Sequence, residues 1–263
     1  MIHIGTSGYS YDDWKGVFYP DHLPQDGFLS FYSKHFNAVE LNFSYYRMPS
    51  ANQLEKMIST TDGKMLFAIK AHQSFTHQRT ASSLEIKQFS DAISPVASAG
   101  CLGAVLLQFP HSFSQNETNR AYLSHLSDKL KFPLVAEFRN AEWVSRPVFN
   151  WLKKINVGYC CVDEPNLPGL MPPIHVATSP IAYVRFHGRN SAKWYTHNHA
   201  YERYDYKYTA NELRQWLAPL ENLSRSSMRT LVFFNNHFQA KAVDSAKQLS
   251  HMLQHWKEMK RKE

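Results

Sequence analysis

With 263 residues, the chain is long enough for one large domain or two small ones, and its 43% hydrophobic residues can form a substantial core. It has no basic start followed by a long apolar run and no stretch of 18 uncharged apolar residues, so we expect neither a signal peptide nor a membrane span but a soluble cytoplasmic protein. Three cysteines are too few for a disulfide framework, and a net charge of +7 mildly favours an anionic partner.

Short β-rich runs alternate with helical patterns along the whole chain. We expect strands at residues 2–7, 38–42, 65–72, 103–109, 134–139, 158–163, 182–187 and 230–235. Apolar residues at helical spacing lie between several of these runs. A capping box at Thr209 and Glu212 predicts a helix start, and a long helix follows from Ala242 to Trp256.

Eight such units in about 250 residues predict a closed (β/α)8 barrel of the TIM-barrel type. An open doubly wound sheet is the alternative, but the turn after the first strand, GTSGYS, lacks the G-x-G-x-x-G spacing of a dinucleotide site. No linker divides the chain. We therefore expect one domain over residues 1–263, with residues 257–263 as a basic, solvated tail.

Two connections depart from the helical pattern. The crossover after the sixth strand is rich in proline, so we expect an irregular loop there. Residues 188–208 follow the seventh strand without a helical pattern and carry six aromatic side chains, including Trp194 and Tyr195. A loop of this length in a compact domain is typical of a lid or binding loop. The tripeptide HNH at 197–199 is too short to indicate a site.

Polar side chains gather toward the carboxyl ends of the strands. Because side chains alternate along a strand, one face of each strand is expected to meet the barrel interior. Barrel interiors are normally filled by branched apolar residues, and barrel enzymes work at the carboxyl end. The inward polar positions predicted from this alternation are Glu40, Asn42, Lys70, His72, Gln108, Glu137, Arg139, Asp163, Arg185, His187 and Asn235.

The predicted charges balance, with three carboxylates and three cations. Such a set could serve as a buried ion-pair network that fixes strand register, and this alternative stays open. In the functional interpretation Glu137, Asp163 and His187 are the catalytic candidates for proton transfer. Lys70, Arg139 and Arg185 would grip a carboxylate or phosphate. The carboxylates and histidines suit a divalent metal in type, but no local motif specifies one, so the cofactor is left unknown.

The motifs FNAVELNFSYYRMP, FAIKAHQSFTH, VAEFRNAEW and YVRFHGRN, together with GTSGYSYDDWKGVFYP, LGAVLLQFP and VFFNNH, resemble the YecE-like family called domain of unknown function 72. The resemblance covers nearly the whole chain in order. It implies a TIM-barrel-like fold and no established reaction. Its recurring polar motifs fall on the positions chosen by alternation and on Asn236, which supports a common site.

Three functions remain open from the sequence. The first is an enzyme that uses acid/base chemistry, with or without a metal, on a small anionic or phosphorylated molecule. The second is a protein that binds or processes nucleic acid through its basic surface and the aromatic loop. The third is a non-catalytic ligand-binding barrel. The substrate and the oligomeric state are not specified by any pattern in the chain.

Overall fold

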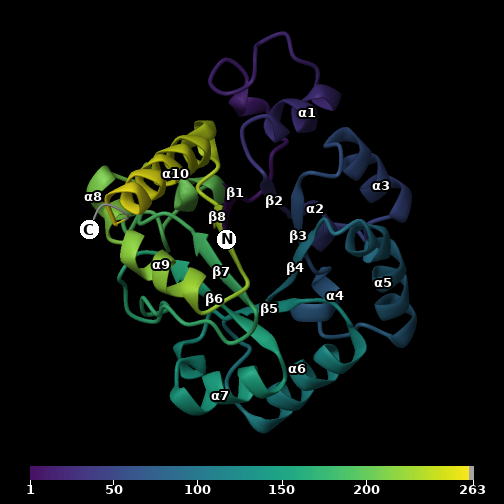
Figure 1. Cartoon of the computed structure of the whole chain (residues 1–263). Coiled ribbons are helices and arrows are strands. Elements are labelled where there is room, and N and C mark those ends of the chain that lie inside the picture. Colours follow the sequence, from purple (N-terminus) through teal and green to yellow (C-terminus); the bar gives the residue numbers. More distant parts are fainter. Residues whose placement is uncertain (261–263) are drawn as a thin grey trace.

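Eight parallel strands form one sheet in the order β1-β8-β7-β6-β5-β4-β3-β2, so each strand pairs with its neighbours in the sequence and β1 returns to β8. The structure is a computed structural model that describes residues 1–260. The predicted (β/α)8 barrel is confirmed (Figure 1). The strands are β1 (Ile2–Thr6), β2 (Ala38–Leu41), β3 (Leu66–Lys70), β4 (Leu102–Gln108), β5 (Leu134–Glu137), β6 (Val157–Asp163), β7 (Ile181–Phe186) and β8 (Arg229–Phe234).

The helices lie outside the strands and cover them (Figure 1). Side-chain caps begin many of them: Ser82 and Glu85 form a capping box at α5, and the predicted box of Thr209 and Glu212 is confirmed at α8. The helices are α1 (Phe28–Ser33), α2 (Phe43–Tyr46), α3 (Ala51–Thr60), α4 (Gln73–Thr76), α5 (Ser83–Ser98), α6 (Glu117–Lys129), α7 (Arg146–Lys154), α8 (Ala210–Arg214), α9 (Leu217–Arg225) and α10 (Lys241–Lys260). Single 3-10 turns are η1 (Asp12–Trp14), η2 (Gln25–Gly27), η3 (Ala141–Trp143), η4 (Ala200–Tyr204) and η5 (Phe238–Ala240).

The two irregular connections differ in outcome. Residues 164–180, between β6 and β7, contain no helix, as their prolines predicted. The loop 188–208 after β7 is less irregular than expected, because residues 200–204 form the short helix η4. In that loop Arg203 Nε donates to the carbonyl of Trp194, which ties its two halves together.

Residues 257–260 of the predicted basic tail are helical instead. Helix α10 continues to Lys260, and the ammonium of Lys260 lies 3.2 Å from a carboxylate oxygen of Glu221 on α9. Lys257 is therefore helical, and only residues 261–263 of the predicted tail lie outside the described residues. None of the helices within residues 1–260 combines the length and apolar character that a bilayer crossing requires.

The barrel closes between β1 and β2 by an isolated bridge instead of a full ladder. Ser7 and Glu40 form this parallel bridge, and the Gly8 amide donates to the Glu40 carbonyl at 2.8 Å. Below the bridge, the hydroxyl of Tyr32 on α1 lies between the two strands. It accepts from the Thr6 amide at 2.9 Å and donates to the Ala38 carbonyl at 3.1 Å.

Glycine is required beside this hydroxyl. A β-carbon on Gly5 would lie 2.0 Å from the carbonyl oxygen of Ala38, so any other residue would force β1 away from β2. The small residue at position 5 therefore serves the close packing of two strands.

We expect Tyr32→Phe to lower the free energy of unfolding by about 1–3 kcal/mol, because the Thr6 amide and the Ala38 carbonyl lose their buried partner. Urea denaturation measures the change. Tyr46→Phe is the matched control, since Tyr46 is exposed and its removal should change stability by less than about 0.5 kcal/mol. Equal stability of both variants would show that water replaces the hydroxyl between the strands.

Candidate active site at the carboxyl end of the barrel

Arg185 of β7 joins two carboxylates across the barrel interior. One guanidinium nitrogen lies 2.7 Å from Glu40 Oε1, and the other lies 2.6 Å from Glu137 Oε2. Tyr183, two residues earlier on the same face, donates to Glu40 Oε2 at 2.7 Å. The four side chains come from β2, β5 and β7 and are buried, and alternation predicted the inward direction of Glu40, Glu137 and Arg185.

Arg139 extends this network toward solvent. Its guanidinium lies 2.7 Å from Glu137 Oε1 and 3.1 Å from Glu164 Oε2, and 16% of its side chain is exposed. The carboxylate of Glu164 also accepts from the Met171 amide at 2.8 Å. Burial raises the pKa of Glu164, although Arg139 opposes the shift. We call Glu40, Glu137, Arg139, Glu164 and Arg185 the ion-pair network.

Glu137 stays ionised in this network. Burial would raise its pKa, but Arg139 and Arg185 act against it and hold the pKa well below its ordinary value. One carboxylate oxygen accepts a hydrogen bond of 2.6 Å from Arg185, and the other forms an ion pair with Arg139 at 2.7 Å. A carboxylate in this state is a weak base near neutral pH.

His187 is neutral and fixed in one orientation. Burial, and then the charge of Arg139, lower its pKa to about 3. Its Nδ1 lies 3.2 Å from the amide nitrogen of Asn235, which can only donate. Nε2 lies 3.1 Å from Glu137 Oε1, which can only accept, and 3.2 Å from a guanidinium nitrogen of Arg139, which can only donate. The imidazole therefore contacts both members of the Glu137–Arg139 ion pair.

Lys70 of β3 lies among these groups and has no carboxylate partner in the described part of the chain. Its ammonium is 4.3 Å from the centre of the Tyr45 ring, and within residues 1–260 it forms no ion pair. Burial, and then the charge of Arg185, lower the pKa of Lys70 to about 8, while Glu137 acts in the opposite direction. The side chain keeps part of its surface exposed.

The other predicted binding residues have mixed positions. Gln108 pairs with Glu137 in the register of β4 and β5, and its side chain is partly exposed. Asn42 begins α2, and its Oδ1 is buried without a hydrogen-bond partner among the described residues. His72 is different, because its Nδ1 bonds the hydroxyl of Ser74 at 2.9 Å. Its ring therefore supports the start of α4.

The two predicted aromatic residues of the loop also differ in their exposure to solvent. Trp194 is 3% exposed and packs against Tyr204, so its ring is not free to stack on a ligand. Tyr195 is 61% exposed, and its hydroxyl donates to the carbonyl of Pro168. The loop reaches the network through Tyr204, whose ring centre lies 6.2 Å from that of His187.

The prediction that Asp163 faces the barrel interior is wrong. Its carboxylate accepts from two nitrogens of Arg189 at 2.8 and 2.6 Å, from the Tyr208 hydroxyl at 2.7 Å and from the Trp216 indole at 2.7 Å. Trp216 and Tyr208 both pack on Phe186, which points out of the barrel. Asp163 therefore holds the loop 188–208 and the start of α9 on the outer face.

Glu164 is a member of the ion-pair network that the sequence analysis missed. It lies on the same face of the chain as Cys160, whose sulfur is 4.0 Å from Glu137 Oε2. Alternation counted from Cys160 would have selected Glu164 in place of Asp163. The uncharged run VGYCCV gives no polar contrast between its two faces. The sequence of β6 alone therefore does not show which of its alternating residues point into the barrel. His77, just after α4, is a second omission, because its pKa is lowered by burial and then by Lys70.

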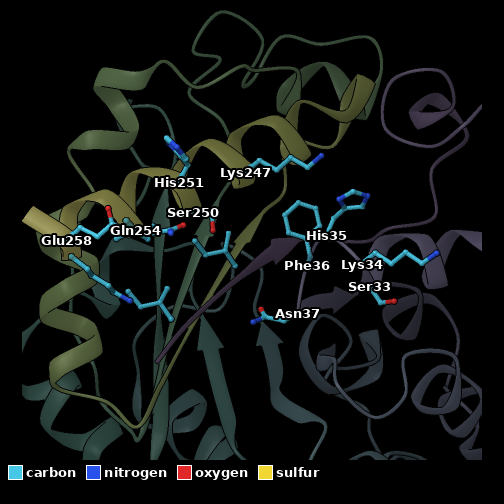
Figure 2. A pocket seen from close by; sticks show the side chains of 14 residues that line it. Ser33, Lys34, His35, Phe36, Asn37, Lys247, Ser250, His251, Gln254 and Glu258 are labelled. Atoms are coloured by element: carbon cyan, nitrogen blue, oxygen red, sulfur yellow. The ribbon is translucent and has the colours of Figure 1, made fainter.

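Within residues 1–260, no three histidine, cysteine, aspartate or glutamate side chains are grouped so that they could hold a metal ion. A hollow of about 800 Å³ lies elsewhere, outside the barrel between the end of α1 and α10. Figure 2 shows Lys34 and His35 on one side of it and Lys247 and His251 on the other. It shares no residue with the ion-pair network.

The comparisons with known proteins agree with this architecture. The family model described as "Protein of unknown function DUF72" matches residues 3–263. The curated protein UPF0759 protein YunF of Bacillus subtilis is 32% identical over 270 residues, which cover 96% of this chain and 95% of that protein.

A solved DUF72 family protein from Thermotoga maritima is 36% identical, with a TM-score of 0.89 and coverage of 97% of this chain and 99% of that chain. One from Enterococcus faecalis is 24% identical with a TM-score of 0.86, covering 97% and 96%. A family 2 AP endonuclease from Brucella melitensis is 10% identical with a TM-score of 0.51, covering 85% and 92%, and shares the fold alone.

Proposed function

We propose that this chain, which belongs to the DUF72 family of proteins of unknown function, is an enzyme that binds a small anionic substrate at the carboxyl end of the barrel and transfers a proton there. One observation carries the proposal. Lys70 is a cation inside the barrel, next to two arginines, with no carboxylate of its own among the described residues. A ligand that brings negative charge would supply the missing partner.

The charge distribution supports an anionic ligand. Glu40 and Glu137 are bound to Arg185, and Arg139 is bound to Glu137 and Glu164, so all three carboxylates of the ion-pair network are held by arginines. The Nε of Arg139 is buried without an acceptor among residues 1–260, while the end of its side chain is partly exposed. A carboxylate or phosphate that contacts Lys70 and the exposed end of Arg139 would therefore give Lys70 the anionic partner that it lacks among the described residues.

Lys70 is also the group best suited to carry a proton. With a pKa of about 8 it exchanges its proton close to neutral pH, whereas Glu137 remains ionised and His187 remains neutral. We therefore assign the proton transfer to Lys70, in place of Glu137 and His187, which the sequence had suggested for this role. In this scheme Glu137 is a positioning residue that holds Arg139 and Arg185, and His187 orients Glu137.

The nucleic-acid alternative has weaker support, because Trp194 is buried and leaves Tyr195 as the single exposed ring of the predicted pair. A base-stacking platform normally uses several such rings along a basic groove.

Lys70→Met is expected to reduce turnover by about 100-fold or more, since it removes both the proton carrier and one anchor of the substrate. Because the proposal names a class of substrate and not one compound, the assay uses a panel of sugar phosphates and 2-oxo acids. ¹H NMR in D₂O detects the exchange of carbon-bound hydrogen for deuterium, or conversion of the compound. Thermal shift with the same compounds at constant ionic strength reports binding.

Lys64→Met is the matched control, because Lys64 is exposed at the amino end of the same strand and should leave exchange unchanged. Full exchange by folded Lys70→Met would remove Lys70 from the reaction. Absence of both binding and exchange across the panel would count against the proposed function as a whole.

A further inference from the structure

The surroundings of Lys70 are unusual for a lysine that serves only as an ionic anchor. An anchoring ammonium is normally stabilised by a nearby carboxylate, but both neighbouring carboxylates are already bound by guanidiniums. The titratable groups that face Lys70 come from five elements or the turns next to them: Glu40, Tyr45, His77, Glu137, Arg139 and Arg185.

The charged form of this amine is therefore costly, and the free amine is accessible. The side chain retains partial exposure at the carboxyl end of β3, where substrates reach barrel enzymes. Desolvation together with neighbouring cations is one of the ways in which proteins activate lysine as a nucleophile. At neutral pH a lysine with a pKa of about 8 holds roughly a tenth of its population as free amine, against less than about a thousandth for an ordinary lysine.

We propose that Lys70 forms an imine with a carbonyl group of the substrate, an inference that rests on the anion site proposed above. The Nζ atom attacks the carbonyl carbon and a C–N bond forms. The carbonyl oxygen then leaves as water with the two protons that the amine nitrogen gives up, and a C=N bond remains. No oxidant, reductant or further reactant takes part.

Two neighbours of Lys70, Tyr45 and Arg139, fit such an intermediate. The face of the Tyr45 ring, 4.3 Å from Nζ, stabilises a positive nitrogen, and a protonated imine keeps that charge in the same place. The exposed end of Arg139 can hold a carboxylate or phosphate on the same molecule. The substrate class is therefore a small aldehyde or ketone that carries an anionic group, such as a 2-oxo acid or a carbonyl phosphate ester.

Reductive trapping tests the proposal on the intact wild-type protein. Glyoxylate is the probe, because it joins an aldehyde to a carboxylate, and sodium cyanoborohydride at pH 7 converts any imine into a stable adduct. Peptide mapping by mass spectrometry then compares sites. We expect label at Lys70 at least about 10-fold faster than at Lys64 and other exposed lysines, because more of Lys70 is free amine. Excess inorganic phosphate should slow label at Lys70 and leave Lys64 unchanged.

Label at Lys70 that is no faster than at Lys64 would overturn the imine. The Lys70→Arg variant separates this failure from failure of the proposed function, since arginine keeps the charge but forms no imine. Loss of exchange in Lys70→Arg with slow labelling of the wild type would leave Lys70 as a proton carrier. If this variant still binds inorganic phosphate, the proposed anion site stands. If it loses phosphate binding and the wild type is labelled slowly, both the anion site and the imine are contradicted.

Discussion

Replacing Arg185 with methionine is expected to lower the free energy of unfolding by about 3–5 kcal/mol, because it leaves two buried carboxylates without their shared cation. Glu40 would keep only the Tyr183 hydroxyl, and Glu137 would keep Arg139 and His187. Methionine has a similar length, so the loss reflects charge more than volume. Urea denaturation at pH 7 measures the change.

A second substitution checks the cause. Arg185→Met combined with Glu40→Gln should recover part of the lost stability, because the double variant no longer buries the unpaired Glu40 charge. A single variant that loses less than about 1 kcal/mol would mean that the network contributes little net stability, as many buried ion pairs do.

The same variant has a predictable pH dependence. The pKa of Glu137 is depressed in the folded protein, so its contribution to stability is present above the unfolded pKa near 4.5 and is lost as pH falls toward the folded value. Arg185→Met weakens that depression. The stability difference between wild type and variant should therefore be constant near neutral pH and narrow once the pH falls below the folded pKa of Glu137 in the variant. A gap that widens as the pH falls would contradict the assignment.

Asp163→Asn is expected to lower the free energy of unfolding by about 2–4 kcal/mol. The carboxylate accepts four hydrogen bonds, two of them from the buried Tyr208 hydroxyl and Trp216 indole. An amide of the same shape presents a donor to at least one of these donors. Thermal denaturation followed by circular dichroism measures the loss, and Asp62→Asn is the control at an exposed position.

The same variant distinguishes a structural from a catalytic Asp163. Because the side chain lies outside the barrel, the folded fraction of Asp163→Asn should keep wild-type exchange activity in D₂O. Activity that disappears while the folded fraction is unchanged would restore Asp163 to the reaction.

The eight strands and their order could be predicted because nearly every strand is apolar and is followed by a recognisable helix or loop signal. The inward faces of β2, β5 and β7 could be predicted too, since Glu40, Glu137 and Arg185 are charged beside apolar neighbours. The inward face of β6 could not be predicted, because Asp163 and Glu164 are both acidic and the six residues before them are uncharged. Two adjacent acids take opposite roles there, one outside and one inside the barrel.

Protonation states were equally hidden from the sequence. Histidine at position 187 suggested a proton carrier, but burial and Arg139 keep it neutral. The availability of Lys70 depends on Arg185 having taken the nearby carboxylates, which only the spatial arrangement reveals.

The Tyr32 hydroxyl between β1 and β2 also has a kinetic consequence. The contact below the Ser7–Glu40 bridge cannot form until α1 is folded, because the hydroxyl that joins Thr6 to Ala38 belongs to that helix. This part of the seam should therefore form only together with α1, and it should open before the continuous strand ladders when the native protein fluctuates. The amide of Thr6 would then exchange with solvent through local opening, well before the opposite wall of the barrel is disturbed.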